Sequence, residues 1–274
     1  MTGPADRVGT LVTLGVFAFV LSTVAGGVWS ALLITNLRAT PTFPWSVAVM
    51  AVLLWVAWQY LNGSRGDPRK AARRRDRLRA TQPTVPVFAW AVVAGSLAIV
   101  GLTGLWIVLW QIARGRGNTL PDFSRYPLVV VVLVIGMASL TAAVAEESGF
   151  RGYFQSALEP RLGGPLAILV TALVMLPAHG VTQGFALTTV FFYMCVDGML
   201  GAIAYITRSI LPGIVVHFIG LVAFFAIIWP FDATRRFVAQ DGPDAWFWLH
   251  VVQVAVGGVL AGLAFRQLAR MTAS

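Results

Sequence analysis

The stretch YPLVVVVLVIGMASLTAAVAEESGFRGYF covers residues 126–154 and decides how the rest of the chain is interpreted. Its first part, Tyr126–Ala145, is an uncharged apolar run of about twenty residues, which is the length a helix needs to cross ~30 Å of hydrocarbon. Two adjacent acids, Glu146 and Glu147, follow directly, and Arg151 comes four residues after the second. Ionised groups at such a depth are costly unless they are paired or hydrated, so they usually have a function. The stretch therefore predicts a membrane helix that leads into a functional polar site.

The composition of the whole chain also favours a membrane protein. Of the 274 residues, 58% are hydrophobic and only 11% are charged, and the mean hydropathy is +0.78. A soluble domain of this length carries more polar surface. The single cysteine, Cys195, excludes an intrachain disulfide and a cysteine-based metal site.

Apolar runs of similar length recur along the chain and predict an all-α fold, a polytopic membrane helix bundle with about eight transmembrane helices. Barrel strands are shorter and alternate in hydropathy, so a β-barrel is excluded. The predicted spans are Val8–Thr35, Phe43–Leu61, Val85–Ile112, Tyr126–Ala145, Pro165–His179 with its flank, Phe185–Ile206, Ile210–Trp229 and Ala245–Phe265.

The positions of the basic residues predict a multi-pass protein of the cell membrane with both termini cytoplasmic. That orientation puts fourteen basic residues on the inner side, against six (Arg38, Arg114, Arg116, Arg125, Arg235 and Arg236) on the outer side. The apolar length of the first run favours an uncleaved anchor over a signal peptide. We expect one integrated membrane domain, with two N-terminal helices and a basic cytoplasmic loop in 1–84 and a six-helix core in 85–274.

Eight of the basic residues lie between Arg65 and Arg79, in the sequence RGDPRKAARRRDRLR. Lys and Arg clustered beside a membrane helix are typical of a cytoplasmic loop that faces anionic lipids, so we expect such lipids as partners. The net charge of +9 does not indicate nucleic-acid binding, because the basic residues are not spread over a folded basic domain.

The segment AEESGFRGYF, residues 145–154, can be analysed geometrically. If it stays helical, Glu147 and Arg151 lie on one face four residues apart, with the acid first, which is the favourable order for an ion pair. Glu146 then points about 100° away, at 3.6 residues per turn, and can face another group. A solvated ion pair at a helix exit is an equally good interpretation of this segment alone.

Two histidines lie inside other apolar segments. His179 follows Pro177 near the end of one run, and His217 follows the sequence ILPGIVV of another. A single histidine in an apolar helix is more often a packed structural residue, but imidazole and carboxylate together are the groups of hydrolytic sites. Asp197 is a further acid within a span, and it fits a spare ligand, a proton relay or a buried structural acid equally well.

The order and spacing of these motifs resemble the CPBP family, the CAAX-protease and bacteriocin-processing group of intramembrane proteases, also called Abi proteins. The likeness covers roughly Ala143 to Leu221. It implies that Glu146 activates the attacking water, that Glu147 and Arg151 support it, and that His179 and His217 complete the site. The family has phenylalanine four residues before the first histidine and asparagine four residues after the second, whereas this chain has Met175 and Leu221 there.

The resemblance implies an intramembrane endopeptidase that hydrolyses a peptide bond of a membrane-associated peptide or protein, with prenylated substrates implied only by its eukaryotic branch. Glu146, His179 and His217 would make a three-ligand set for a divalent metal, most simply zinc. A glutamate that binds metal is a poorer base, so a metal-dependent and a glutamate-dependent protease both stay open. Leu221 cannot form a hydrogen bond, and losing one such donor commonly costs ~10²–10³ in rate.

Two readings without proteolysis stay open beside the enzyme. A catalytically weak or inactive scaffold or immunity protein on the same fold would explain Leu221, and a proton-coupled transporter would also hold intramembrane acids and histidines. In a helix that starts near Gly164, His179 lies ~22 Å along the axis, far from an acid at an inner helix end. We therefore expect Arg151–Leu162 to be a tilted, partly embedded interfacial segment. The oligomeric state is not predicted.

Overall fold

The computed structural model describes residues 4–114 and 123–273, which are helical and contain no β-strand. The predicted all-α fold is therefore confirmed. The helices are α1 (Pro4–Ala39), α2 (Trp45–Leu61), α3 (Pro68–Leu78), α4 (Val85–Ala113), η1 (Phe123–Arg125), α5 (Leu128–Glu146), η2 (Glu147–Gln155), α6 (Ser156–Leu162), α7 (Gly164–Gln183), α8 (Leu187–Thr207), α9 (Leu211–Ala223), η3 (Phe224–Ile228), η4 (Trp229–Thr234), α10 (Val238–Asp241) and α11 (Ala245–Ala273). Arg116, one of the outer-side arginines of the orientation argument, lies outside the described residues.

Seven helices of the described part are long and apolar enough to cross a membrane. An eighth apolar helix, α2, has 17 residues and is slightly shorter. The predicted bundle of about eight spans thus corresponds to seven long helices and one short one. The chain is a multi-pass membrane protein.

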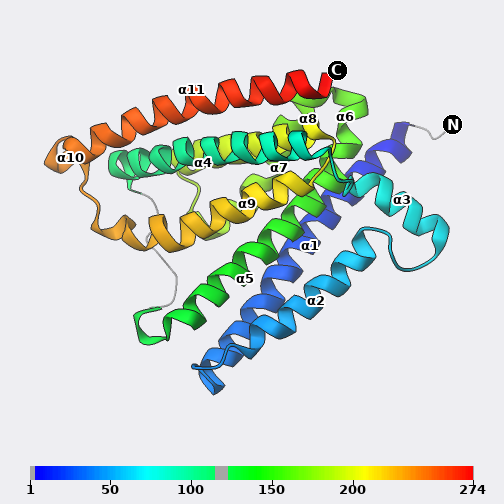
Figure 1. Ribbon diagram of the computed structural model, residues 1–274, viewed down its shortest axis with the longest axis horizontal. Coiled ribbons are helices and arrows are strands. Elements are labelled where there is room, and N and C mark those ends of the chain that lie inside the picture. Colours follow the sequence, from blue (N-terminus) through cyan, green and yellow to red (C-terminus); the bar gives the residue numbers. More distant parts are fainter. Residues whose placement is uncertain (1–3, 115–122, 274) are drawn as a thin grey trace.

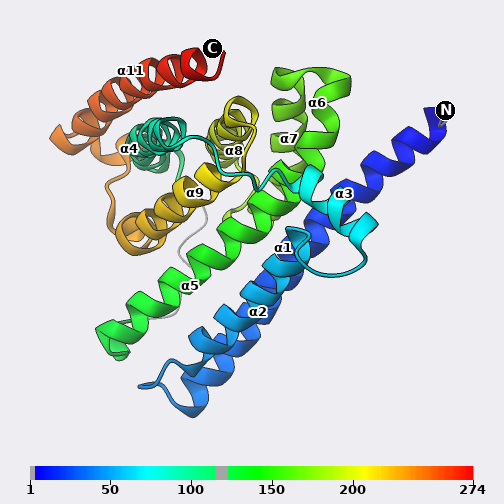
Figure 2. The ribbon, with the colours of Figure 1, turned by 45° about the vertical axis from the view of Figure 1, so that its right-hand side comes forward.

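Helix α5 runs through the middle of the bundle (Figure 1). It packs against α1 and α2 on one side and against α9 on the other, and Figure 2 shows these two groups of helices separated by α5. Helices α4, α8 and α11 extend the second group, and α7 packs against α8. Because α5 leads into Glu146, the acids lie between the two groups.

Two helices approach very closely where glycines face each other. A Cβ atom added at Gly257 of α11 would lie 2.7 Å from the backbone N and Cα of Gly101 of α4. Small residues allow such close backbone approach in membrane bundles, where van der Waals packing drives association. This contact attaches the long, mostly exposed helix α11 to the core.

The basic segment 65–79 contains a helix rather than only the predicted loop. Helix α3 begins after Asp67, whose side chain accepts hydrogen bonds from the backbone N–H groups of Arg69 and Lys70, and Pro68 occupies the first helical position. Both are ordinary helix-start signals. The helix-start signals of Asp67 and Pro68 lie within a strongly charged segment, and the sequence analysis considered only its charge.

A buried acid, Glu159 of α6, ties this end of the bundle together. It accepts a hydrogen bond from Arg79, which follows α3, at 2.7 Å and one from Arg208, which follows α8, at 3.0 Å. Gln155 also donates to Glu159 at 3.1 Å. The turns after α3 and α8 are therefore fixed onto the same short helix.

Candidate active site

The helix that carries the two acids does not end at them. After Glu146 the chain continues directly into η2, a π-helix whose nine residues, 147–155, are all buried, and then into α6. The predicted interfacial segment is therefore wrong for Arg151–Gln155, because these residues lie inside the bundle. Arg151 pairs with Glu147 and Asp197, and Gln155 donates hydrogen bonds to Glu159 and to the backbone oxygen of Gly201. One continuous apolar helix, Leu128–Leu162, brings the acids into the interior, and π-helical turns of this kind often occur at functional sites.

The predicted ion pair between Glu147 and Arg151 is present. Arg151 Nη1 lies 3.5 Å from Glu147 Oε1, and both side chains are fully buried. Gly149 and Gly152 of the same π-helix allow close neighbours, since a Cβ at either would approach the backbone of Ala18 or Leu78 to about 3.0 Å. These glycines thus allow α1 and the end of α3 to pack closely against η2.

His217 of α9 contacts both acids. Its Nδ1 lies 2.9 Å from Glu147 Oε1, and its Nε2 lies 3.7 Å from Glu146 Oε2. Helix α9 can approach this closely because Gly213 has no side chain: a Cβ there would lie 2.9 Å from Glu147 Oε2. Glu147 therefore fixes the orientation of the imidazole, and the other ring nitrogen faces Glu146.

His179 of α7 is held by a different acid. Its Nε2 lies 3.3 Å from Oδ2 of Asp197 in α8, and the other carboxylate oxygen of Asp197 accepts a hydrogen bond from Arg151 Nη2 at 2.6 Å. The sequence singled out Asp197 without assigning it a partner. An acid within an apolar run was the available signal, because such a group needs a buried cation nearby.

Tyr193 is a further neighbour that the sequence did not indicate. Its ring lies flat on the imidazole of His179, with centroids 3.8 Å apart and an angle of 7° between the planes. Tyr193 stands four residues before Asp197 in α8, so one face of that helix supplies both contacts to His179.

The buried charges form one connected group. Arg151 lies between Glu147 and Asp197, and each of these acids in turn holds one histidine. Met175, which replaces the phenylalanine of the family, contacts the guanidinium through its sulfur at 2.9 Å. The substitution of methionine for phenylalanine thus places a weak acceptor, rather than a ring, beside the arginine.

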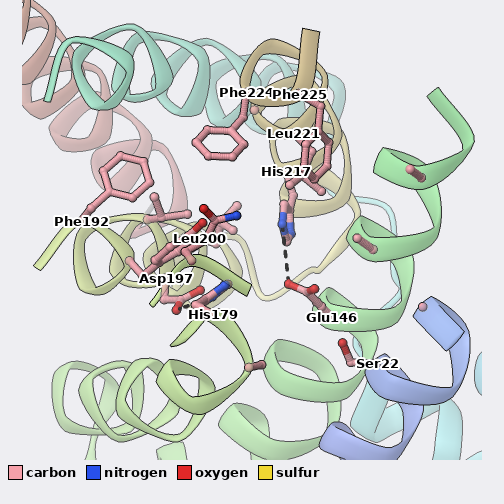
Figure 3. A pocket seen from close by; sticks show the side chains of 18 of the residues that line it. Ser22, Glu146, His179, Phe192, Asp197, Leu200, His217, Leu221, Phe224 and Phe225 are labelled. Carbon is pink, nitrogen blue, oxygen red and sulfur yellow. Dashed lines mark ion pairs between the residues drawn. The ribbon is translucent and has the colours of Figure 1, made fainter. Parts of the chain in front are cut away.

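A cavity of about 630 Å³ lies beside these groups. Glu146, His179, Asp197 and His217 all line it, and Figure 3 shows His217 above Glu146 and His179 next to Asp197. Leu221 also lines the cavity, so the position where the family has asparagine presents an apolar side chain to this space. The volume is within the usual range of ~300–1,000 Å³ for small-molecule sites.

Helix α1 contributes a wall of the same cavity, which the sequence analysis missed. The lining residues from this helix are Phe19, Ser22, Thr23, Gly26 and Trp29. Ser22 lies close to Glu146 in Figure 3. No charge or motif in α1 indicated this role, because the helix has the composition of any other membrane span.

The arrangement does not fit the predicted metal-ligand set of Glu146, His179 and His217. Within 4–114 and 123–273, no three His, Cys, Asp or Glu side chains are grouped so that they could hold a metal ion. One ring nitrogen of each histidine faces a carboxylate, Nδ1 of His217 facing Glu147 and Nε2 of His179 facing Asp197, so only the other nitrogen of each ring could bind a metal. Zinc therefore stays a prediction of the sequence, and no chemical step below is assigned to it.

The third histidine is not part of this group. His250 lies in α11, where its Nδ1 is 2.8 Å from the side-chain oxygen of Gln253 and its ring stacks near Trp246. These contacts with Gln253 and Trp246 indicate that His250 has a structural role.

Comparison with known proteins gives one match. Residues 128–221 match the family model described as type II CAAX prenyl endopeptidase Rce1-like, which is roughly one third of the chain. No curated protein and no solved structure matches. The matched segment includes Glu146, Glu147, Arg151, His179 and His217, whereas α1, α2, α4 and α11 lie outside it.

Proposed function

We propose that this chain, which belongs through residues 128–221 to the CPBP family of CAAX-type membrane proteases, hydrolyses a peptide bond of a membrane-associated substrate within its cavity. One observation carries the proposal. Glu146 and His217 face each other at 3.7 Å on the cavity wall, and His217 is held from behind by Glu147. A carboxylate and an oriented imidazole at one wall are suited to removing a proton from water.

In the proposed reaction Glu146 is the general base. It accepts a proton as the water oxygen forms a bond to the carbonyl carbon of the substrate, and the carbonyl oxygen becomes an oxyanion. The C–N bond then breaks, and Glu146 returns the proton to the leaving amine nitrogen. The products are a carboxylic acid and an amine, so one water is consumed and the side chain is regenerated.

The two histidines position the water and the substrate around this centre. His217 stands beside Glu146 with its Nδ1–H group held by Glu147, so its Nε2 can accept a hydrogen bond from the water. Arg151 compensates the charge of Glu147 and has no direct chemical part. Preorganised polar groups of this kind act strongly where water is excluded.

The decisive test replaces Glu146 by glutamine, which keeps the shape and removes the base. The protein in lipid nanodiscs is offered three quenched fluorescent peptides: one with a farnesylated C-terminal cysteine, the same peptide without the lipid, and an apolar transmembrane peptide. We expect the wild type to cleave at least one and Glu146→Gln to lose ~10²–10⁴ of that rate. His250→Gln is the matched control and keeps full activity.

Two results would contradict the protease. Equal cleavage by the wild type and Glu146→Gln would mean that another group, or a contaminant, does the chemistry. Cleavage of none of the peptides, together with unchanged biological activity of Glu146→Gln, would favour the scaffold. Flux of protons across liposomes that depends on Glu146 would favour the transporter.

The zinc prediction has its own measurement. The metal content of purified wild type is compared with that of His179→Gln and His217→Gln by mass spectrometry. One zinc per chain that is lost in both variants would support the predicted ligand set. The same trace content in all three proteins would exclude it.

A further inference from the structure

The site contains two carboxylate–histidine pairs that the sequence did not predict. Glu147 holds His217 at 2.9 Å, and Asp197 lies 3.3 Å from His179. The two pairs share Arg151, which lies 3.5 Å from Glu147 and 2.6 Å from Asp197. Both histidines line the cavity and each contacts an acid that Arg151 also contacts, although Asp197 reaches the cavity wall itself whereas Glu147 does not line it.

Arg151 contacts two acids, Glu147 and Asp197, which is one more than its single positive charge can neutralise. One arginine needs one carboxylate for neutrality, and Glu147 already supplies it. Asp197 adds a second negative charge in a buried place, where its side chain is only 2% exposed. An uncompensated buried carboxylate is costly. The remaining negative charge is partly offset where His179 directs the N–H group of its Nε2 at Asp197.

We propose that Asp197 is a positioning residue of the reaction: it fixes the ring and the tautomer of His179 as Glu147 fixes those of His217. The inference rests on the proposed function for its catalytic part. It assigns opposite tautomers to the two rings, because Nε2 of His179 faces an acid whereas Nδ1 of His217 does. A carboxylate behind a histidine sets which nitrogen carries the proton and how basic the other one is.

The rest of α8 supports this assignment. Tyr193 stacks on His179 with nearly parallel planes, so the imidazole cannot tilt out of its plane. Asp197, one turn later in α8, contacts Nε2 and so opposes rotation of the imidazole within that plane. Arg151 holds Asp197 in place from η2 through a 2.6 Å hydrogen bond. Three elements, α7, α8 and η2, thus fix one imidazole at the cavity wall.

The tautomers are testable without any substrate. The chain has three histidines, so a ¹⁵N-histidine spectrum of the protein in nanodiscs is assigned with His179→Gln and His250→Gln. We expect the proton of His179 on Nε2 and that of His217 on Nδ1. A wild-type spectrum with His179 protonated on Nδ1 alone would overturn the proposal, and it requires no variant of Asp197.

The variant Asp197→Asn tests the cause. We expect the His179 signals to change to a mixture of tautomers while those of His217 keep theirs. The matched control is Asp232→Asn, which also removes a buried acid but one bonded to Trp106 and Arg235 outside the cavity. It should leave both histidines unchanged. A His179 spectrum that is the same in the wild type and Asp197→Asn would contradict the proposal.

The catalytic part is tested with a double-mutant cycle on whichever peptide the wild type cleaves. Asp197→Asn should lower kcat about 10–100-fold with little change in KM, as loss of an orienting carboxylate commonly does. In a background of His179→Gln the same change should cost less than about twofold, because Asp197 acts through that ring. Equal losses in both backgrounds would mean that Asp197 acts only as a structural partner of Arg151.

The two proposals fail in distinguishable ways. If the wild type cleaves no peptide, the hydrolase is wrong, and the spectra still decide whether Asp197 orients His179. If cleavage depends on Glu146 but the spectra show no effect of Asp197, the hydrolase stands and the positioning role is wrong. Melting of each variant in nanodiscs shows whether the compared proteins are equally folded.

Discussion

Arg151 is the residue on which the polar interior depends. Its guanidinium is fully buried and contacts two acids from different helices as well as Met175. Removing one partner of a buried ion pair typically costs ~3–5 kcal/mol, because the other charge remains uncompensated. Substitution of Arg151 is therefore expected to lower the stability of the fold, whether or not Arg151 affects the reaction.

Leu221 gives a prediction at the same scale. It lies four residues after His217 on α9 and lines the cavity, so asparagine there would add a hydrogen-bond donor to the wall that carries His217. We expect Leu221→Asn to raise the peptide cleavage rate at least tenfold, since one oxyanion donor is worth ~10²–10³ in rate. Ile219→Asn, on the same helix but outside the cavity lining, is the control and should not raise it. An unchanged rate in a folded Leu221→Asn protein would mean that the donor comes from elsewhere.

The sequence predicted the contact of Arg151 with Glu147 but not its contact with Asp197, and the distance along the chain explains the difference. The Glu147–Arg151 pair followed from local helix geometry, since only four residues separate the two. The Asp197–Arg151 contact spans 46 residues, and no periodicity indicates which faces of two helices meet across such a distance. For the same reason, the sequence did not predict the contact of Tyr193 with His179 or the part of the cavity wall that α1 supplies.

Among the helices, η2 explains the main difference between the expected and the observed structure. A charged segment after a long apolar run was predicted to lie at the interface, whereas the π-helix keeps it buried. The charges satisfy one another there, so the usual reason for leaving the membrane is absent. Helix periodicity does not show this, because pairing across helices decides it.

The contact between α4 and α11 predicts the effect of one methyl group. A Cβ at Gly257 would overlap the backbone of Gly101, whereas one at Gly258 meets nothing within 4 Å. We expect Gly257→Ala to lower stability by about 1–3 kcal/mol, as overpacking does. Gly258→Ala should be neutral or slightly stabilising, because alanine favours helix. Thermal unfolding in detergent measures both, and equal melting temperatures for the two variants would contradict the packing argument.

Helix α3 gives a second prediction about an element. Arg69, Lys70, Arg73 and Arg77 are exposed on it, and the buried Ala71 and Leu78 attach it to the bundle. We propose that this basic face, the four exposed residues just named, binds anionic lipid headgroups at about 1 kcal/mol for each charge. Replacing all four by glutamine should abolish the extra melting stability that phosphatidylglycerol gives over phosphatidylcholine.

The control for α3 removes exposed arginines elsewhere. Arg38→Gln with Arg236→Gln changes charge in the last turn of α1 and between η4 and α10, and should keep the lipid preference. A preference that survives the α3 variant, or is lost equally in the control, would show that the lipid effect has another origin.

At the scale of the whole molecule, the cavity joins helices that are far apart in the sequence. Residues of α1, α4, α5, α7, α8, α9 and η3 line it, so it exists only when these helices have packed together. The number and type of spans could be predicted from hydropathy, because a membrane imposes length on each helix. The order of the helices around α5 could not, since lipid-facing and helix-facing sides are equally apolar.

Filling the cavity from α1 tests whether substrate binds there. Gly26 lines the cavity, and a Cβ on it meets nothing within 4 Å, so leucine fits without displacing the helix. We expect Gly26→Leu to raise KM at least tenfold, because its side chain occupies the space for substrate. Gly27→Leu is the matched control, since Gly27 has equally open surroundings and does not line the cavity. Equal KM values for the two variants would place the substrate elsewhere.

The wall contributed by α1 has an evolutionary implication. Part of the cavity wall comes from outside residues 128–221, the segment that matches the family model and holds Glu146, His179 and His217. Substitutions in α1 can therefore change the shape of the cavity without altering these three side chains. A chimera carrying residues 19–29 from a homologue should acquire the donor's preference with its turnover chemistry intact.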